Sequence, residues 1–102
     1  MVQTLTEENI NSQINKGLVA IDCFTSWCNP CKMMEPIIEE AASLTKKAIF
    51  YKVNVEDTPD FSGTYGITTV PTVLFFKEGQ LIKTVSGLKP KEEFIRIIDE
   101  IS

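Results

Sequence analysis

The segment Leu18–Phe24 limits the fold of this chain more than any other feature of the sequence. Its residues are apolar at both odd and even positions, with Asp22 as the exception. Successive side chains of a strand point to opposite faces, so a strand with this pattern is buried on both sides. Such strands lie in the middle of a sheet that helices cover on both faces. The segment therefore predicts an α/β protein.

The segments around this strand predict the rest of a mixed sheet. A helix and a second strand at Ala48–Val55 follow it, which implies a parallel, right-handed crossover. Thr72–Lys77 and Gln80–Ser86 flank the turn Glu78-Gly79 and predict an antiparallel hairpin. Four helical segments are predicted. The first runs from Thr6, its cap, to Gly17, and the second from Cys28 through Ala42 with a kink at Pro36. The third is a short connector at Pro59–Gly66, and the last runs from Pro90 to Ile101.

Size and charge restrict the class of protein further. The chain has 102 residues and a net charge of −4, which predicts a single domain over residues 1–102 and argues against nucleic acid as a partner. No apolar run exceeds four residues, far fewer than the ~20 that cross a bilayer, so no membrane association is expected. Met1–Glu8 has neither the basic start nor the apolar core of a signal peptide, so a cytoplasmic location is expected.

The three cysteines, at positions 23, 28 and 31, indicate redox chemistry. An odd count is a poor framework for structural disulfides. Three thiols without a histidine fall short of the four ligands of a usual zinc or iron–sulfur site, so a metal would need a second subunit or carboxylates. Reversible thiol–disulfide exchange remains for Cys28-Asn29-Pro30-Cys31, and incidental cysteines are the alternative. The prediction includes no metal and no bound cofactor.

The position of this motif at the start of a helix favours reactive thiols. Cys28 is expected at or beside the N-cap, where free amides and the helix dipole favour a thiolate and lower its pKa below ~8.5. Cys31 follows one turn later on the same face, within reach of Cys28. Pro30 fixes its own φ and keeps Asn29 extended, so the two residues form a rigid spacer.

Several segments together resemble the thioredoxin family. Trp27–Lys32, preceded by Ile21-Asp22, resembles the active-site motif of the family, and Tyr65–Thr72 resembles its second signature. Phe76–Gly79 and Ser86-Gly87 resemble the hairpin and the final loop. The resemblance covers essentially the whole chain. It implies the thioredoxin fold, in which four helices flank a central mixed sheet of five strands.

The resemblance also implies a function, a general reductase of protein disulfides. It makes Cys28 the nucleophile, Cys31 the resolving thiol and Asp22 the proton acceptor. From the sequence alone, Asp22 is a carboxyl in a buried strand, where desolvation raises its pKa, or a strand-end residue that faces solvent. The implied partners are a thioredoxin reductase and disulfide-containing proteins, and the implied oligomeric state is a monomer.

Six residues are expected to contact substrate. Val70–Pro71 is by resemblance a cis peptide whose loop pairs with an extended substrate chain. The expected set is Trp27, Asn29, Pro30, Val70, Pro71 and Gly87.

Three positions depart from the family pattern. Asn29 replaces glycine, which predicts an altered redox poise or partner preference. Phe24 replaces tryptophan and keeps the aromatic bulk. Cys23 replaces phenylalanine and is expected in the core, with a secondary redox thiol as the alternative. A reductant specialised for one partner, or a non-catalytic module that only binds, remains open.

Overall fold

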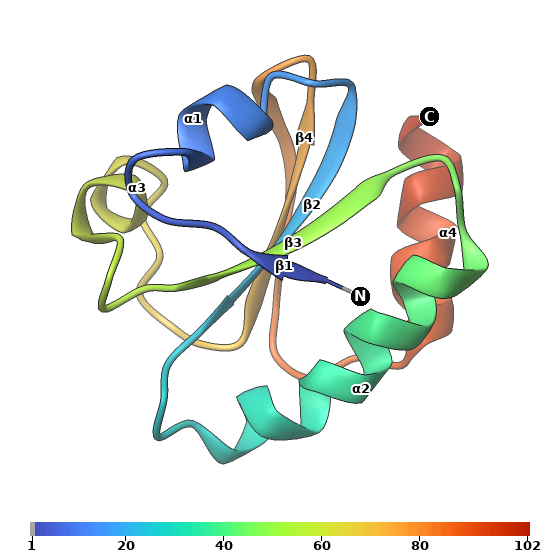
Figure 1. Cartoon of the computed structure of the whole chain (residues 1–102). Helices are drawn as coiled ribbons and strands as arrows, with labels where there is room; N and C mark the ends of the chain where they lie inside the picture. The colour runs from blue at the N-terminus through green and yellow to red at the C-terminus, as the bar shows by residue number, and fades with distance from the viewer. Residues whose placement is uncertain (1) are drawn as a thin grey trace.

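The computed structural model describes residues 2–102 and has a central five-stranded sheet with helices on both faces (Figure 1). The strands are β1 (Gln3–Thr4), β2 (Leu18–Phe24), β3 (Ile49–Asn54), β4 (Thr72–Lys77) and β5 (Gln80–Ser86). The helices are α1 (Ile10–Gln13), α2 (Asn29–Leu44), α3 (Pro59–Thr64) and α4 (Lys91–Ile101). The predicted mixed sheet with four flanking helices is confirmed.

Strand β2 occupies the centre of the sheet, whose order is β1-β3-β2-β4-β5. It pairs with β3 in parallel and with β4 antiparallel, and β1 and β5 complete the two sides. The register places Asp22 beside Lys52 on β3 and beside Val73 on β4. Neighbours on both sides and helices on both faces give Asp22 the buried position that the apolar pattern predicts.

Two apolar cores lie on opposite faces of the sheet (Figure 1). Helices α2 and α4 cover one face, where Phe75 packs with Phe94 at a ring-centroid distance of 6.4 Å. Helices α1 and α3 cover the other, where Phe76 meets Phe61 and Tyr65. The consecutive residues Phe75 and Phe76 thus belong to different cores, as the alternation of a strand requires.

The first helix is shorter than predicted, and an edge strand precedes it. Regular α-helix covers only Ile10–Gln13. Thr6 nevertheless caps the preceding turn, because its Oγ1 accepts a bond from Asn9 N (3.3 Å) while Asn9 Oδ1 accepts one from Thr6 N (2.8 Å). Strand β1 has two residues, too few to show a hydrophobic period, and the pattern of the sequence did not locate it.

Helix α2 is continuous through Pro36, from Asn29 to Leu44. The kink expected at Pro36 stays a prediction.

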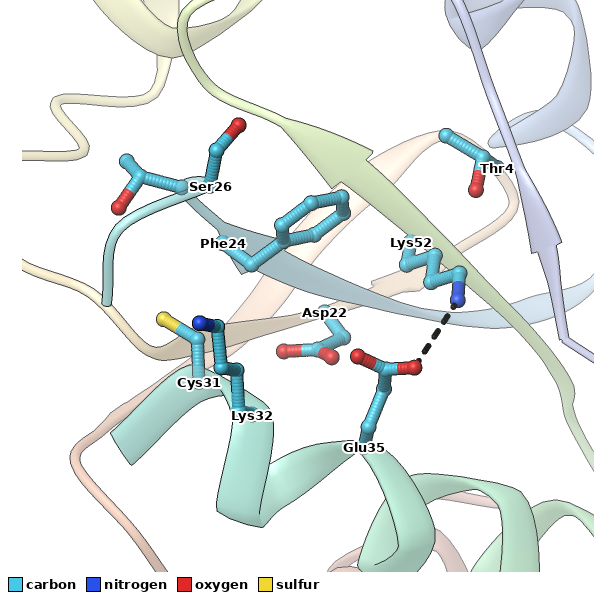
Figure 2. Close-up of a pocket in the computed structure, with 9 residues that line it drawn as sticks. Thr4, Asp22, Phe24, Ser26, Cys31, Lys32, Glu35 and Lys52 are labelled. Carbon is cyan, nitrogen blue, oxygen red and sulfur yellow. Dashed lines mark ion pairs between the residues drawn. The ribbon is translucent and has the colours of Figure 1, made fainter. Parts of the chain in front are cut away.

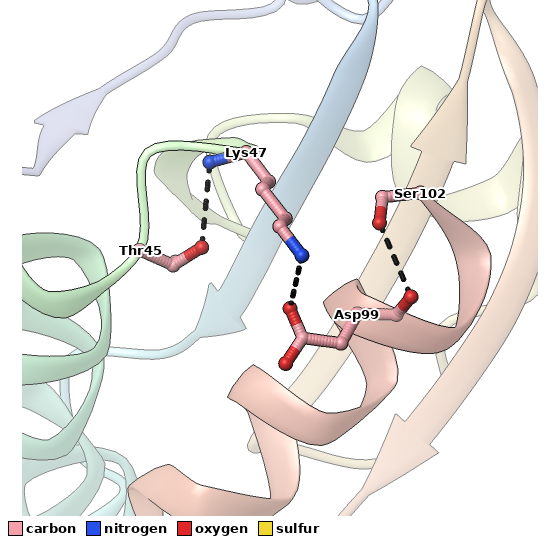
Figure 3. Close-up of polar contacts among 4 residues, drawn as sticks. All are labelled: Thr45, Lys47, Asp99 and Ser102. Atoms are coloured by element: carbon pink, nitrogen blue, oxygen red, sulfur yellow. Dashed lines mark hydrogen bonds and ion pairs between the residues drawn. The ribbon is translucent and has the colours of Figure 1, made fainter.

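An ion pair connects the loop after α2 to α4: Lys47 donates to Asp99 at 2.9 Å (Figure 3). In the same region, Lys47 N donates to Thr45 Oγ1 at 3.3 Å, and Ser102 Oγ donates to the Asp99 carbonyl at 3.1 Å. Both ends of the ion pair are exposed, so it stabilises the fold by less than about 1 kcal/mol.

Helix α3 has its N-terminus capped by a residue from a distant part of the chain. The Glu7 carboxylate accepts bonds from the backbone N–H groups of Asp60 (2.8 Å) and Phe61 (3.0 Å). These are two of the amides that a helix leaves free at its start. Glu7 thereby joins the α1 segment to α3, an interaction that no local pattern reveals.

Replacing Glu7 with glutamine should lower the free energy of unfolding by about 1 kcal/mol. The charged acceptor opposite two amides at the positive end of the helix dipole becomes a neutral one. Urea unfolding measures the change. Glu8→Gln is the matched control: it removes the same charge from the neighbouring residue, and both backbone N–H groups donate to Glu7. Equal losses in the two variants would contradict the capping role.

Candidate active site

The predicted dithiol lies where β2 leads into α2. Cys28 is the N-cap residue of α2, and it forms a disulfide with Cys31, their Cα atoms lying 5.2 Å apart. The Sγ atom of Cys28 accepts a bond from the backbone N–H of Cys31 at 3.1 Å. Pro30 lies in the first turn of the helix, where the missing N–H costs nothing. Asn29 is the first residue of α2, so the extended conformation expected for it before Pro30 is wrong, because the helix already begins there. Both the disulfide pairing and the helix-start position of the motif are confirmed.

The two cysteines of the disulfide differ in their access to solvent. Cys31 is 4% exposed, whereas Cys28 is half-buried. Trp27, directly before Cys28, is 72% exposed, so it is not part of the core. Asn29 and Pro30 are exposed as well. A large partner can reach Cys28, while Cys31 is shielded.

Asp22 lies behind the dithiol at the wall of a cavity of about 170 Å³, which also reaches Cys31 (Figure 2). Asp22 is 3% exposed, and its Oδ1 has no hydrogen-bond partner within residues 2–102. The alternative of a solvent-facing aspartate is wrong. Burial raises the pKa of Asp22 to about 7, Lys52 opposes the shift, and Glu35 adds to it. At that pKa the carboxyl exchanges protons near neutral pH.

Polar side chains from three segments line the cavity. Lys52 on β3 forms an ion pair with Glu35 on α2, with 3.9 Å between Nζ and Oε1. Ser26, in the loop between β2 and α2, is held by the Glu56 carboxylate at 3.4 Å and by Asn54 Nδ2 at 3.3 Å. The residues that line the cavity are Thr4, Asp22, Phe24, Thr25, Ser26, Cys31, Lys32, Glu35 and Lys52.

The loop before β4 carries the remaining predicted site residues. The Val70–Pro71 bond is cis, as the resemblance implies. Thr72, directly after Pro71, pairs with Cys23 near the C-terminal end of β2. Pro71 therefore lies at the same end of the strands as the segment that carries the dithiol. Gly87 N donates to the Pro71 carbonyl at 2.8 Å and brings the last loop to the same place. Gly87 has φ +92°, a conformation that favours glycine.

Sequence reasoning missed Glu35 and the loop network around Ser26. Glu35 follows Cys31 by four residues, so helical spacing alone places both on one face of α2. The Ser26–Glu56 contact joins residues 30 apart in the chain, and nothing in the sequence indicates it. Thr25 is also buried, and its Oγ1 has no partner within residues 2–102.

The third cysteine belongs to the core. Cys23 is fully buried beside Val53 and Leu74, and burial raises the pKa of its thiol, which opposes thiolate formation. The prediction of a core cysteine agrees with this position. Within residues 2–102, no group of three or more metal-ligating side chains is found, and no helix is long and apolar enough to cross a membrane.

A reversible disulfide at the start of a helix, above a buried carboxyl on such a sheet, is the arrangement of a protein disulfide oxidoreductase. Comparison with known proteins gives the family. The family model described as thioredoxin matches residues 1–100. A thioredoxin of Chlamydia caviae is 41% identical over 102 residues, covering 100% of both chains. A thioredoxin of Listeria monocytogenes is 33% identical, covering 98% of both.

Solved structures agree. A Plasmodium falciparum thioredoxin superposes with a TM-score of 0.90 at 29% identity, over 99% of this chain and 100% of the other. Mitochondrial thioredoxin 3 of Saccharomyces cerevisiae gives a TM-score of 0.87 at 28% identity, over 97% and 94%. This chain belongs to the thioredoxin family, and Cys28 and Cys31 are its redox-active pair.

Proposed function

We propose that the chain is a general reductant of protein disulfides in which Cys28 attacks, Cys31 resolves and Asp22 accepts a proton. The Cys28 thiolate attacks one sulfur of the substrate disulfide, and the other sulfur leaves as a thiolate that takes up a proton. Cys31 then gives its proton to the Asp22 carboxylate and attacks Cys28 Sγ. The bond between Cys28 and the substrate breaks, and the second substrate sulfur leaves with a proton. The dithiol has supplied two electrons.

The difference in exposure between the two thiols carries this proposal. Cys28 is half-buried at the N-cap and faces the free amides of α2, which stabilise a thiolate. Cys31 is 4% exposed and shares a cavity with Asp22, whose pKa of about 7 suits proton exchange in neutral solution. The sulfur of Cys28, which is the more accessible of the two, can meet a protein disulfide, whereas the shielded sulfur of Cys31 can meet only Cys28.

Substrate contacts are proposed for the surface around Cys28. Trp27, Asn29 and Pro30 come from the dithiol segment, and Val70, Pro71 and Gly87 from the two loops that meet beside β4. An extended substrate chain would pair with backbone groups of this surface, a mode that depends little on substrate sequence. This supports a reductant with many substrates over one specialised for a single partner.

The proposal extends to the setting of the protein. Oxidation of substrate leaves the Cys28–Cys31 disulfide, so another protein, a thioredoxin reductase, must restore the dithiol. The family implies reductase and substrate proteins as partners. We propose further that residues 1–102 act as one domain, as a monomer, and in the cytoplasm, whose reducing poise keeps such a dithiol available.

The test is the reduction of insulin disulfides by dithiothreitol, followed by the turbidity of the released chains. We expect catalytic amounts of the protein to accelerate it at least tenfold. The control is the same protein with Cys28 and Cys31 alkylated after reduction. A non-catalytic binding module would give no acceleration, and that result would refute the proposal. Acceleration confined to one of several unrelated disulfide proteins would indicate a specialised reductant instead.

A further inference from the structure

Glu35 has a position in the site that the proposed exchange leaves unexplained. Its side chain is 60% exposed and stands at the rim of the cavity that joins Asp22 to Cys31 (Figure 2). It follows Cys31 by one turn of α2, so both residues present to the same cavity. A carboxylate at this rim lies between the buried acid and solvent.

Lys52 is the cation for which two carboxylates compete. It is Asp22's direct neighbour across the β2–β3 pairing, and it is 21% exposed. Its ion pair is nevertheless with Glu35, at 3.9 Å, and within residues 2–102 no ion pair joins it to Asp22. The dashed line in Figure 2 joins Lys52 to Glu35, and no such line reaches the Asp22 carboxyl. The Oδ1 atom of Asp22 has no hydrogen-bond partner within residues 2–102.

Burial sets the raised pKa of Asp22, and the position of Lys52 modulates it. An ammonium group beside a carboxylate favours the ionised form, so a Lys52–Asp22 pair would make Asp22 a weak proton acceptor. A second carboxylate nearby has the opposite effect, both by repulsion and by holding the cation elsewhere. The charged and titratable side chains around the cavity are Asp22 from β2, Lys52 from β3, and Cys31, Lys32 and Glu35 from α2. Strand β1 contributes the uncharged Thr4, and β4 places the apolar Val73 beside Asp22.

We propose that Glu35 is a positioning residue for disulfide exchange: it holds Lys52 away from Asp22, so that Asp22 can take the Cys31 proton when Cys31 attacks Cys28. The inference rests on the proposed role of Asp22 as acceptor. Glu35 itself touches neither sulfur nor substrate in this role. It acts through the cation.

The direct test is the titration of the Asp22 carboxyl by carbon-13 NMR in the oxidised protein, where Cys28 and Cys31 do not titrate. The Asp22 resonance is assigned by its loss in Asp22→Asn. Glu35→Gln should lower the midpoint of the Asp22 titration by roughly 0.5 to 1 pH unit, because Lys52 becomes free to pair with Asp22. Glu40→Gln removes the same charge from the same helix at a residue that pairs with Lys91 instead, and it should leave the midpoint unchanged.

Lys52→Gln separates the two ways in which Glu35 can act. This variant should raise the midpoint, and Glu35→Gln in the same chain should then have a smaller effect than in the wild type. An equally large effect in both backgrounds would mean that Glu35 acts by repulsion alone, which overturns its hold on Lys52. An unchanged midpoint in Glu35→Gln, or an equal shift in Glu40→Gln, overturns the inference as well.

Kinetics distinguishes this failure from a failure of the proposed function. The pH profile for release of substrate from the mixed disulfide should move to lower pH in Glu35→Gln, together with the midpoint. If Asp22→Asn released substrate at the wild-type rate, Asp22 would not be the acceptor, and both proposals would fall. If Asp22→Asn were slow while Glu35→Gln left midpoint and profile unchanged, only the role of Glu35 would fall.

Discussion

Cys31→Ser should turn this protein into a covalent trap for its substrates. Cys28 keeps its half-buried position at the helix start and still attacks a disulfide, but no thiol remains to break the resulting bond. Catalytic reduction of insulin should fall by on the order of a thousandfold, while a mixed disulfide between the variant and insulin accumulates. Non-reducing gel electrophoresis and mass spectrometry of the adduct measure both effects.

The matched variant is Cys28→Ser, which should lose turnover to the same extent and trap nothing at neutral pH. The remaining Cys31 is 4% exposed and out of reach of a protein disulfide. Iodoacetamide should for the same reason alkylate Cys28 first in the reduced wild-type protein. If Cys28→Ser formed the adduct and Cys31→Ser did not, the two roles would be reversed.

Asp22→Asn should make the oxidised protein more stable in neutral and alkaline solution. Asp22 has a pKa of about 7 in the folded protein and 3.8 as its ordinary value. Between these two values the carboxyl is protonated in the folded protein and ionised in the unfolded chain, so unfolding releases a proton and a rise in pH favours the unfolded state. The contribution to stability is full below pH 3.8, declines as pH rises towards 7 and is lost above 7, where the folded protein buries a charged carboxylate. The free energy of unfolding of the wild type should thus fall by about 2–3 kcal/mol between pH 5 and pH 8.

Urea unfolding at several pH values measures this dependence. Asp22→Asn should show almost none of it, while Asp57→Asn, which removes an exposed carboxylate, should follow the wild type. Parallel curves for wild type and Asp22→Asn would mean that Asp22 is not a buried acid with a raised pKa. The same variant should also slow insulin reduction by roughly a hundredfold at pH 7, the usual contribution of a proton acceptor.

The sequence predicted the central fold well because its strongest pattern lies in the central strand. Leu18–Phe24, apolar at both odd and even positions, indicated a strand buried on both faces. The turn Glu78-Gly79 predicted the hairpin with the strand bounds that the structure shows, and these two residues have φ values of +52° and +84°. The helix after Cys28 was predicted from the apolar residues that follow the motif at spacings of three and four. These features are local, so a single segment contains the whole signal.

The features that sequence reasoning missed all join distant segments. Strand β1 exists because Gln3 and Thr4 pair with Tyr51 and Lys52, and their own side chains are exposed. Glu7 caps a helix more than 50 residues away, at Asp60. Lys52 lies beside Asp22 because of the register of β2 and β3, and it pairs with Glu35 because α2 turns that residue towards the sheet. A polar side chain has no periodic signature, so only the folded chain shows its partner.

The cavity behind the dithiol affects how fast the protein can work as well as what it can do. A volume of about 170 Å³ is that of several water molecules, and the rim residues Lys32 and Glu35 are open to solvent. In the proposed exchange, a proton that leaves the shielded Cys31 can cross this cavity to Asp22 and reach solvent at its rim without any opening of the sheet. Proton transfer of this kind does not require a fold that opens locally.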